Sequence, residues 1–218
     1  MASAPAHIED LLNSDDRYEV SSLEVLESFL DEQMKNGTYF LDANLAILKL
    51  FLLYPKETKE EVLKNILLKA LMAFPAPDFS LCMYQIPEKY HASVKDVIDL
   101  AQQLEMAKFK TFWKLAAETK LLKDMKDWEA AVHTFIAGVV SATYRSIKSD
   151  ELLEILSMSA PDLEKLMKAN GWTRSKEDKS VVIVNTETFK PKKQEVKEPA
   201  NMTLEQYTTM FVASSFQA

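Results

Sequence analysis

The chain has 218 residues, of which 47% are hydrophobic and 27% are charged. This balance is typical of a folded globular protein and excludes a chain that is disordered throughout. The formal net charge of −7 gives the whole molecule no attraction for nucleic-acid phosphates or anionic lipid. The only glycines, Gly37, Gly138 and Gly171, lie too far apart to form a loop that cradles nucleotide phosphates. P-loop and dinucleotide-binding enzymes are therefore excluded.

The cellular compartment is constrained by cysteine use and hydropathy. Cys82 is the only cysteine, so an intramolecular disulfide is impossible and a reducing compartment fits. The first residues show no basic segment leading into an apolar run, as a secretory signal would. No apolar stretch approaches the roughly 18 residues that a membrane-spanning helix needs. We therefore expect a cytoplasmic protein without a membrane partner.

The first part of the chain has the apolar spacing of helices. In residues 21–34, Leu23, Leu26, Phe29, Leu30 and Met34 fall on one face. Residues 41–55 are apolar nearly all round, which predicts a helix buried on several sides and stopped by Pro55. Further helices are expected at residues 60–74, 93–105 and 107–119. The spacings Ser21–Glu24 and Thr58–Glu61 predict capping boxes.

Short connections between these helices predict antiparallel packing of neighbours in a stack. No strict sequence repeat accompanies the stack. We therefore expect a mostly α protein that begins with a HEAT-like helical-repeat domain over residues 1–126.

The pattern changes after residue 126. A long helix is expected over residues 128–147, followed by short helices at 149–159 and 160–170, with Ser159 as cap and Gly171 as terminator of the last. A charged turn and the Val/Ile-rich stretch 180–184 then predict a β-hairpin. Three helices followed by a hairpin is the order of a winged helix, so residues 127–190 are predicted to form a winged-helix domain.

The hairpin, or wing, is the candidate interface of this domain. Its positive charges at Arg174, Lys176 and Lys179 exceed the negative charges of Glu177 and Asp178 by one. The helix that would enter a DNA groove has balanced charges and no arginine, so weak or no direct nucleic-acid binding is expected. A protein-interaction module is favoured over a nucleic-acid-binding winged helix. The candidate wing and interface residues are Trp172, Arg174, Lys176, Lys179, Val182 and Ile183.

No catalytic, metal-binding or cofactor-binding residues are expected. His7 lies near the terminus, in a segment expected to fray, and neither His91 nor His133 has further ligands at the spacing of a zinc site. Cys82 has no neighbouring base and is interpreted as a small buried apolar residue. The aromatic clusters Phe109–Phe112–Trp113 and Trp128–Phe135 have the spacing of a core.

Residues 191–218 read as a polar linker followed by an amphipathic helix. Thr203 and Gln206 have capping-box spacing. This helix either covers the core of its own chain or docks on a partner, and its Met, Tyr and Phe content favours the partner. The candidate docking residues are Leu204, Tyr207, Met210 and Phe211.

A helical stack followed by a winged helix resembles the PCI proteins, which are shared by the proteasome lid, the deneddylating signalosome and eukaryotic translation initiation factor three. An ordered set of short motifs is spread over about residues 16–192: Asp16–Tyr18, Leu41–Leu50 with Pro55, Ile66–Leu71 with Pro75, Asp78–Cys82, Phe109–Trp113, Gly171–Trp172 and Lys190–Lys192. These motifs closely resemble the subunit k family of the initiation factor.

The resemblance implies a non-catalytic scaffold subunit that supports the initiation complex on the small ribosomal subunit. The implied partners are other subunits of initiation factor three, chiefly subunit l, and the small ribosomal subunit through the complex. The resemblance also implies that the winged helix offers its sheet edge to a neighbouring subunit. The alternatives are a PCI subunit of the proteasome lid or signalosome and, further away, a nucleic-acid-binding winged helix.

Overall fold

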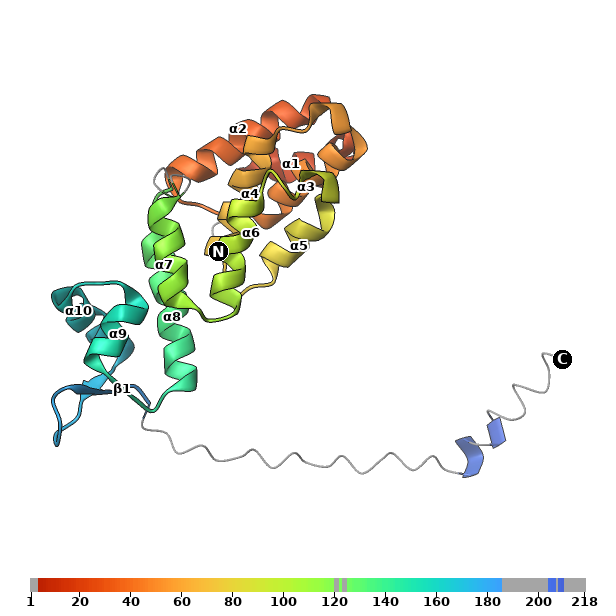
Figure 1. Ribbon diagram of the computed structural model, residues 1–218. Helices are drawn as coiled ribbons and strands as arrows, with labels where there is room; N and C mark the ends of the chain where they lie inside the picture. Colours follow the sequence, from red (N-terminus) through yellow and green to blue (C-terminus); the bar gives the residue numbers. More distant parts are fainter. Residues whose placement is uncertain (1–3, 120–121, 123–124, 186–203, 207, 210–218) are drawn as a thin grey trace. The chain divides into compact units, whose positions relative to one another are not determined.

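The computed structural model describes residues 4–119, 122, 125–185, 204–206 and 208–209. The chain divides into two units, Met1–Thr186 and Glu187–Ala218. The described residues of the first unit are mostly helical, as predicted (Figure 1).

The first unit begins with a run of helices. In chain order they are α1 (Ala6–Asn13), the 3-10 turn η1 (Asp15–Tyr18), α2 (Ser21–Asn36), α3 (Leu41–Leu53), η2 (Pro55–Glu57), α4 (Glu60–Met72), α5 (Asp78–Gln85), η3 (Glu88–Tyr90), α6 (Lys95–Glu105) and α7 (Phe109–Glu118). The predicted helices at 21–34, 41–55, 60–74, 93–105 and 107–119 correspond to α2, α3, α4, α6 and α7.

These helices are stacked as pairs. The members of each pair α2–α3, α4–α5 and α6–α7 contact one another. Successive pairs are also in contact, because α2 packs on α4, α4 on α6, and α3 on α5 (Figure 1). The apolar faces predicted from helical spacing form the core between the pairs, and α3 is buried around most of its circumference.

A small buried polar cluster fixes the connection between α2 and α3. The Gln33 amide nitrogen donates to Asn44 Oδ1 over 3.1 Å, and its carbonyl oxygen accepts the Phe40 backbone N–H over 2.9 Å. The ammonium group of Lys69, from α4, donates to the carbonyl oxygen of Thr38 over 3.0 Å. The buried side chains of Gln33, Asn44 and Lys69 are therefore paired where the core meets this connection.

The N-terminal segment and two helix caps differ from the predictions. Residues 6–13 form α1 rather than a frayed end, and Ile8 is fully buried. Ser21 does not cap α2, because the preceding Val20 is already helical and backbone carbonyls of the preceding turn accept the first amides. Thr58 likewise does not cap α4: its hydroxyl donates to Phe51 O over 3.4 Å, which closes the turn after α3.

The remaining elements of the first unit combine three helices with a small sheet. They are α8 (Trp128–Thr143), β1 (Ser146–Lys148), α9 (Ser149–Leu156), α10 (Ala160–Asn170), β2 (Thr173–Arg174) and β3 (Val181–Ile183), and we call them together the helix–sheet segment. Gly171 ends α10 in the left-handed conformation with φ 70°, as predicted. The predicted hairpin is formed by β2 and β3.

The sheet contains a strand that the sequence did not predict. β1 lies in the stretch that was expected to end the long helix, and α8 stops before it at Thr143. The strand order is β1–β3–β2, with β3 antiparallel to both neighbours. The last strand among the described residues is therefore the middle strand of the sheet.

Candidate protein interface

The sheet offers its free edges at β1 and β2, not at β3. Ser146 is paired with Ile183 on one side of β3, while Thr173 is paired with the same residue on the other side. Among the described residues, β1 and β2 each have one strand neighbour. An added strand from a partner would therefore lie beside β1 or β2.

The hydrogen bonds that flank β1 show which of its amides point outward. Val184 N donates to Arg145 O over 2.9 Å, and Ser149 N donates to Ser180 O over 2.7 Å. In an antiparallel pair every second residue bonds to the partner strand, so Ile147 faces β3 as Arg145 and Ser149 do. The backbone groups of Ser146 and Lys148 point away from β3, toward the free edge.

The apolar candidates of the wing lie mostly inside the fold. Trp172 is 5% exposed and Val182 is fully buried. Ile183, on the face opposite Val182, is half-buried. Trp172 and Val182 therefore belong to the core of the helix–sheet segment, whereas the side chain of Ile183 remains partly accessible.

Arg174 is held by its own fold rather than extended into solvent. Its Nε donates to Glu164 Oε1 on α10 over 3.0 Å, and its Nη1 donates to Ser149 Oγ over 3.2 Å and to Lys179 O over 2.7 Å. The carboxylate of Glu164 offsets the guanidinium charge. Lys176 and Lys179 are exposed, and they share the turn with Glu177 and Asp178. This arrangement leaves little net positive charge for phosphate contacts.

Of the titratable candidates, Cys82 is buried and His91 contacts the backbone, whereas His7 is exposed. Burial, with a smaller effect of the Asp78 carboxylate, raises the pKa of the Cys82 thiol to about 12, so the thiol is not ionised at neutral pH. His91 Nε2 lies 3.0 Å from Ile86 O. His7 is exposed on α1. Within the described part of the chain no three His, Cys, Asp or Glu side chains are grouped so as to hold a metal ion.

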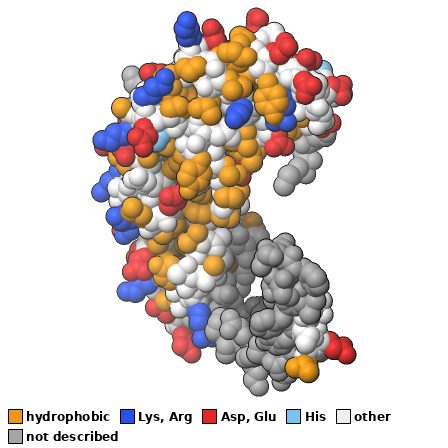
Figure 2. Space-filling model, turned by 90° about the vertical axis from the view of Figure 1, so that its right-hand side faces the viewer, with side chains coloured by type: hydrophobic (Ala, Val, Ile, Leu, Met, Phe, Trp, Pro, Cys, Tyr) orange, Lys and Arg blue, Asp and Glu red, His pale blue; other side chains and the backbone are white. Residues whose placement is uncertain are grey.

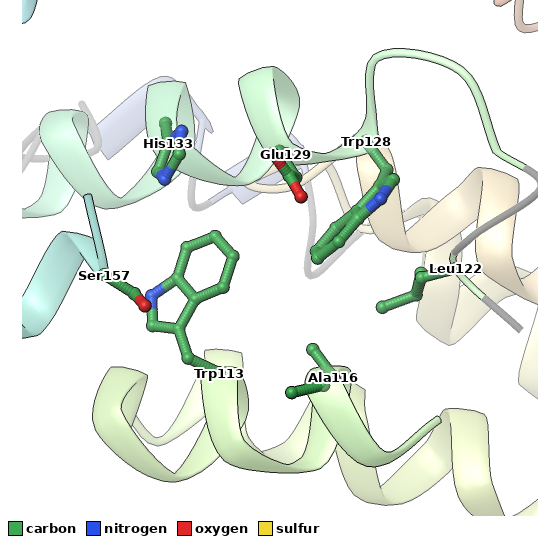
Figure 3. A pocket seen from close by; sticks show the side chains of 8 residues that line it. Trp113, Ala116, Leu122, Trp128, Glu129, His133 and Ser157 are labelled. Carbon is green, nitrogen blue, oxygen red and sulfur yellow. The ribbon is translucent and has the colours of Figure 1, made fainter. Parts of the chain in front are cut away.

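The indole of Trp113 joins the helical stack to the helix–sheet segment, and the imidazole of His133 binds the same end of α9 from within that segment. Trp113 Nε1, on α7, donates to Ile155 O over 2.9 Å, and His133 Nε2, on α8, lies 2.9 Å from Leu156 O. Because a carbonyl oxygen only accepts, His133 carries its proton on Nε2. Both side chains thus bind the last carbonyls of α9, which have no partner within their own helix. Figure 3 shows Trp113 and His133 on the two sides of this joint.

An apolar surface that the sequence did not single out lies on η1, α3 and α5. We call it the α3–α5 surface, and its exposed side chains are Tyr18, Leu53, Tyr54, Leu81 and Tyr84. Tyr84 is 88% exposed, and the Tyr54 hydroxyl donates to Tyr18 O over 3.3 Å. Figure 2 looks onto the side that carries α5 and shows groups of hydrophobic side chains on it. The sequence signal for this surface was the composition of residues 41–55. They are apolar on more faces than the core covers, so some apolar side chains remain exposed.

The predicted docking helix is described in part. Residues 204–206 and 208–209 are helical, and the Leu204 side chain is 82% exposed. Tyr207, Met210 and Phe211 lie outside the described residues. Partner docking by this segment therefore stays a prediction.

The chain was compared with known families and proteins. The family model described as the CSN8/PSMD8/EIF3K family matches residues 57–194. Proteins called eukaryotic translation initiation factor 3 subunit K, from Drosophila willistoni, Drosophila persimilis and Drosophila mojavensis, are each 34% identical to it over 189 residues. The match covers 85% of this chain and 85% of each relative.

A mostly helical fold with stacked helical pairs, followed by a small sheet, defines the class as a PCI-like helical protein. The chain belongs to the CSN8/PSMD8/EIF3K family. The resemblance to subunit k that the sequence motifs indicated is confirmed. In the described residues no helix has the length and apolarity needed to cross a membrane.

Proposed function

We propose that this chain is a non-catalytic scaffold subunit of eukaryotic translation initiation factor three. The observation that carries the proposal is the 34% identity to subunit K proteins over 85% of the chain. In this role the chain contributes protein contacts that help the factor assemble the initiation complex on the small ribosomal subunit in the cytoplasm. Binding to the ribosome is through the complex.

In the domain organisation proposed for this role, residues 1–126 are a HEAT-like helical-repeat domain, residues 127–190 a winged helix, and residues 191–218 a linker with a docking helix. Exposed tyrosine and leucine side chains on the α3–α5 surface have the composition of a protein interface, in which aromatic residues are enriched. This surface suits an apolar face of a neighbouring subunit.

Subunit l is the proposed chief partner, and the β1 edge is the proposed contact. Ser146 and Lys148 present backbone N–H and C=O groups outward, and a strand from the partner would satisfy them. The Val182–Ile183 strand is not the proposed pairing edge, because both sides of β3 are occupied.

The edge contact is tested by Ser146→Pro. Proline has no backbone N–H. The N–H of Ser146 points away from β3, so its loss should leave the fold intact. An added strand from the partner would lose one hydrogen-bond donor. Ser146→Ala keeps the N–H and is the matched control. Weaker binding of subunit l to the proline variant alone supports the contact. Equal binding of both variants at unchanged melting temperature contradicts it.

Affinity purification of the full chain from its own cells tests the assignment itself. Initiation factor subunits and small-subunit ribosomal proteins should co-purify. The family model also spans signalosome and proteasome members, so a lid or signalosome subunit is the second candidate. Recovery of peptidases or cullins in place of initiation factors would reject the first proposal in favour of the second.

A further inference from the structure

A pocket of about 470 Å³ lies where α7 and α8 meet the end of α9. Its walls include Trp113 and Ala116 from α7, Trp128 and Glu129 from α8, and Ser157 directly after α9. Figure 3 shows Trp113 on one side, Trp128 and Glu129 on the other, and Leu122 at one end. The volume falls in the range of clefts that hold small ligands or single side chains, about 300–1,000 Å³.

The two indoles form an open angle instead of a closed stack. The ring centroids of Trp113 and Trp128 are 5.8 Å apart and their planes are inclined by 44°. Both side chains are half-buried, unlike Phe109 and Phe112, which are buried in the core. The sequence spacing predicted a core role for Phe109, Phe112, Trp113, Trp128 and Phe135. This prediction is incomplete, because the indoles of Trp113 and Trp128 keep accessible surface in the pocket.

Three features of the pocket favour a positive charge. The π-face of an indole attracts cations, and the half-buried Trp128 ring offers such a face, whereas the Trp113 ring is already in contact with the His133 imidazole at a centroid distance of 5.0 Å. Glu129 extends from α8 toward the two indoles (Figure 3), and its carboxylate has no hydrogen bond or ion pair with another described residue. The last carbonyls of α9, at Ile155 and Leu156, add the negative end of a helix dipole beside Ser157.

No described residue that lines the pocket supplies the positive charge. Its described walls contain neither lysine nor arginine. His133 is already engaged with Leu156 O through Nε2. The pocket thus combines features that attract a cation with described walls that provide none.

We propose that this pocket binds the guanidinium group of an arginine side chain presented by a partner polypeptide. A guanidinium is planar, so it stacks on an indole while it donates two hydrogen bonds to one carboxylate, whereas an ammonium is a strongly hydrated point charge. Arginine is also enriched at protein interfaces. The identification of the partner as a subunit of the initiation factor rests on the proposed function. The cation site itself does not depend on that function.

The full-length chain, labelled with ¹⁵N, tests the site by titration with N-acetyl-arginine amide. The indole N–H signals of Trp113, Trp128 and Trp172 are read separately after assignment with single Trp→Phe variants. Saturable shifts are expected for Trp113 and Trp128, with a dissociation constant on the order of 1 mM. Trp172 does not line the pocket and is the internal reference.

Charge and aromatic contributions are separated by matched controls. N-acetyl-citrulline amide has nearly the same shape without the charge and should shift neither signal. Glu129→Gln should weaken arginine binding about 3- to 10-fold, while Glu105→Gln, an exposed acid on α6 outside the pocket, should leave it unchanged. Equal responses to arginine and citrulline, no saturable response, or unchanged binding in Glu129→Gln would each overturn the cation site.

The partner's arginine is tested by Glu129→Lys in cells, with Glu105→Lys as control. A lysine at position 129 supplies its own cation and repels the guanidinium, so less partner protein should co-purify than with the control. Equal recovery would show that the pocket does not take a partner's arginine. The titration uses the isolated chain, so failure of the pocket and failure of the proposed function give different results.

Discussion

The indole N–H of Trp172 donates a hydrogen bond to the Ser141 hydroxyl oxygen over 3.2 Å, and this bond links the end of α10 to α8. The Trp172 side chain is 5% exposed, so its ring is part of the core of the helix–sheet segment. Trp172→Ala removes the ring and leaves a cavity, which typically costs about 3–5 kcal/mol. We expect a clearly lower melting temperature in calorimetry.

Ser141→Ala is the control for this variant, because it removes the hydrogen bond and keeps the ring. It should cost about 1 kcal/mol. A Trp172→Ala protein that melts with the wild type would show that the ring does not stabilise the fold and serves as an interface anchor instead.

The turn of the wing is expected to play no part in tight nucleic-acid binding. Arg174 is already bonded to Glu164, and Lys176 and Lys179 are exposed beside two acids. The triple variant Arg174→Ala, Lys176→Ala, Lys179→Ala should still join its complex. The isolated wild-type chain should bind duplex DNA weakly, and binding should fade as salt rises.

The double variant Lys176→Ala, Lys179→Ala keeps Arg174. Comparing it with the triple variant separates the contribution of the Arg174–Glu164 pair to stability from the effect of the exposed lysines. Losing the exposed Arg174–Glu164 pair should cost about 1 kcal/mol or less, so the double variant should melt slightly above the triple variant. Tight, sequence-dependent DNA binding at physiological salt would refute the scaffold assignment.

Lys69 gives the protein a specific dependence on pH. Its side chain is buried, its ammonium group has a hydrogen bond to Thr38 O, and burial lowers the pKa of this lysine below its usual value of 10.5. Between the folded and unfolded pKa values the unfolded chain binds more protons, so this residue makes stability rise as the pH increases through that window.

Lys69→Met fills the same space without a charge and should melt at a higher temperature than the wild type at pH 7. The difference should shrink as the pH rises toward 10.5 and level off only above it, where the lysine has lost its proton in both the folded and the unfolded state. Melting curves of both proteins across this range measure it. A difference that stays constant or widens would contradict a buried, destabilised ammonium group.

The tail is tested by truncation after Pro199, which removes the predicted docking helix. Leu204 is exposed, and a short helix with an apolar face needs a surface to hold it. The truncated chain should remain folded and monomeric, with weaker binding to its neighbouring subunit. Leu204→Ala in the full chain should weaken the same binding without changing the melting temperature.

Aggregation of the truncated chain, or a much lower melting temperature, would instead assign the helix to the core of its own chain. Light scattering and calorimetry distinguish the two results.

Helices and their buried faces were predictable from sequence because their signal is local. The spacing of Leu23, Leu26, Phe29 and Leu30 identifies the buried face of α2, and all four are buried. The caps at Ser21 and Thr58 were wrong for a physical reason. Backbone carbonyls of the preceding turn accept the first amides of α2, and α4 begins one residue later than predicted, with Lys59 and not Thr58 at its N-cap position.

The interface elements depend on contacts between distant residues, which sequence spacing does not record. β1 has three residues, too few to show alternation, and its strand conformation comes from pairing with β3. The pocket likewise needs Trp113, Glu129 and Ser157 from three separate helices or their ends. No local pattern distinguishes these indoles from core aromatics.

The middle position of β3 sets an order of events during synthesis. β1 and β2 leave the ribosome first, and neither has the other as a neighbour in the sheet. The nascent chain therefore carries two unpaired strands until Val181–Ile183 emerges and joins them, whereas the helical pairs need only nearby residues to form. A ribosome stalled before Val181 would hold a folded helical stack with an unfinished sheet, so the edge offered to a partner exists only once nearly all of the first unit has been made.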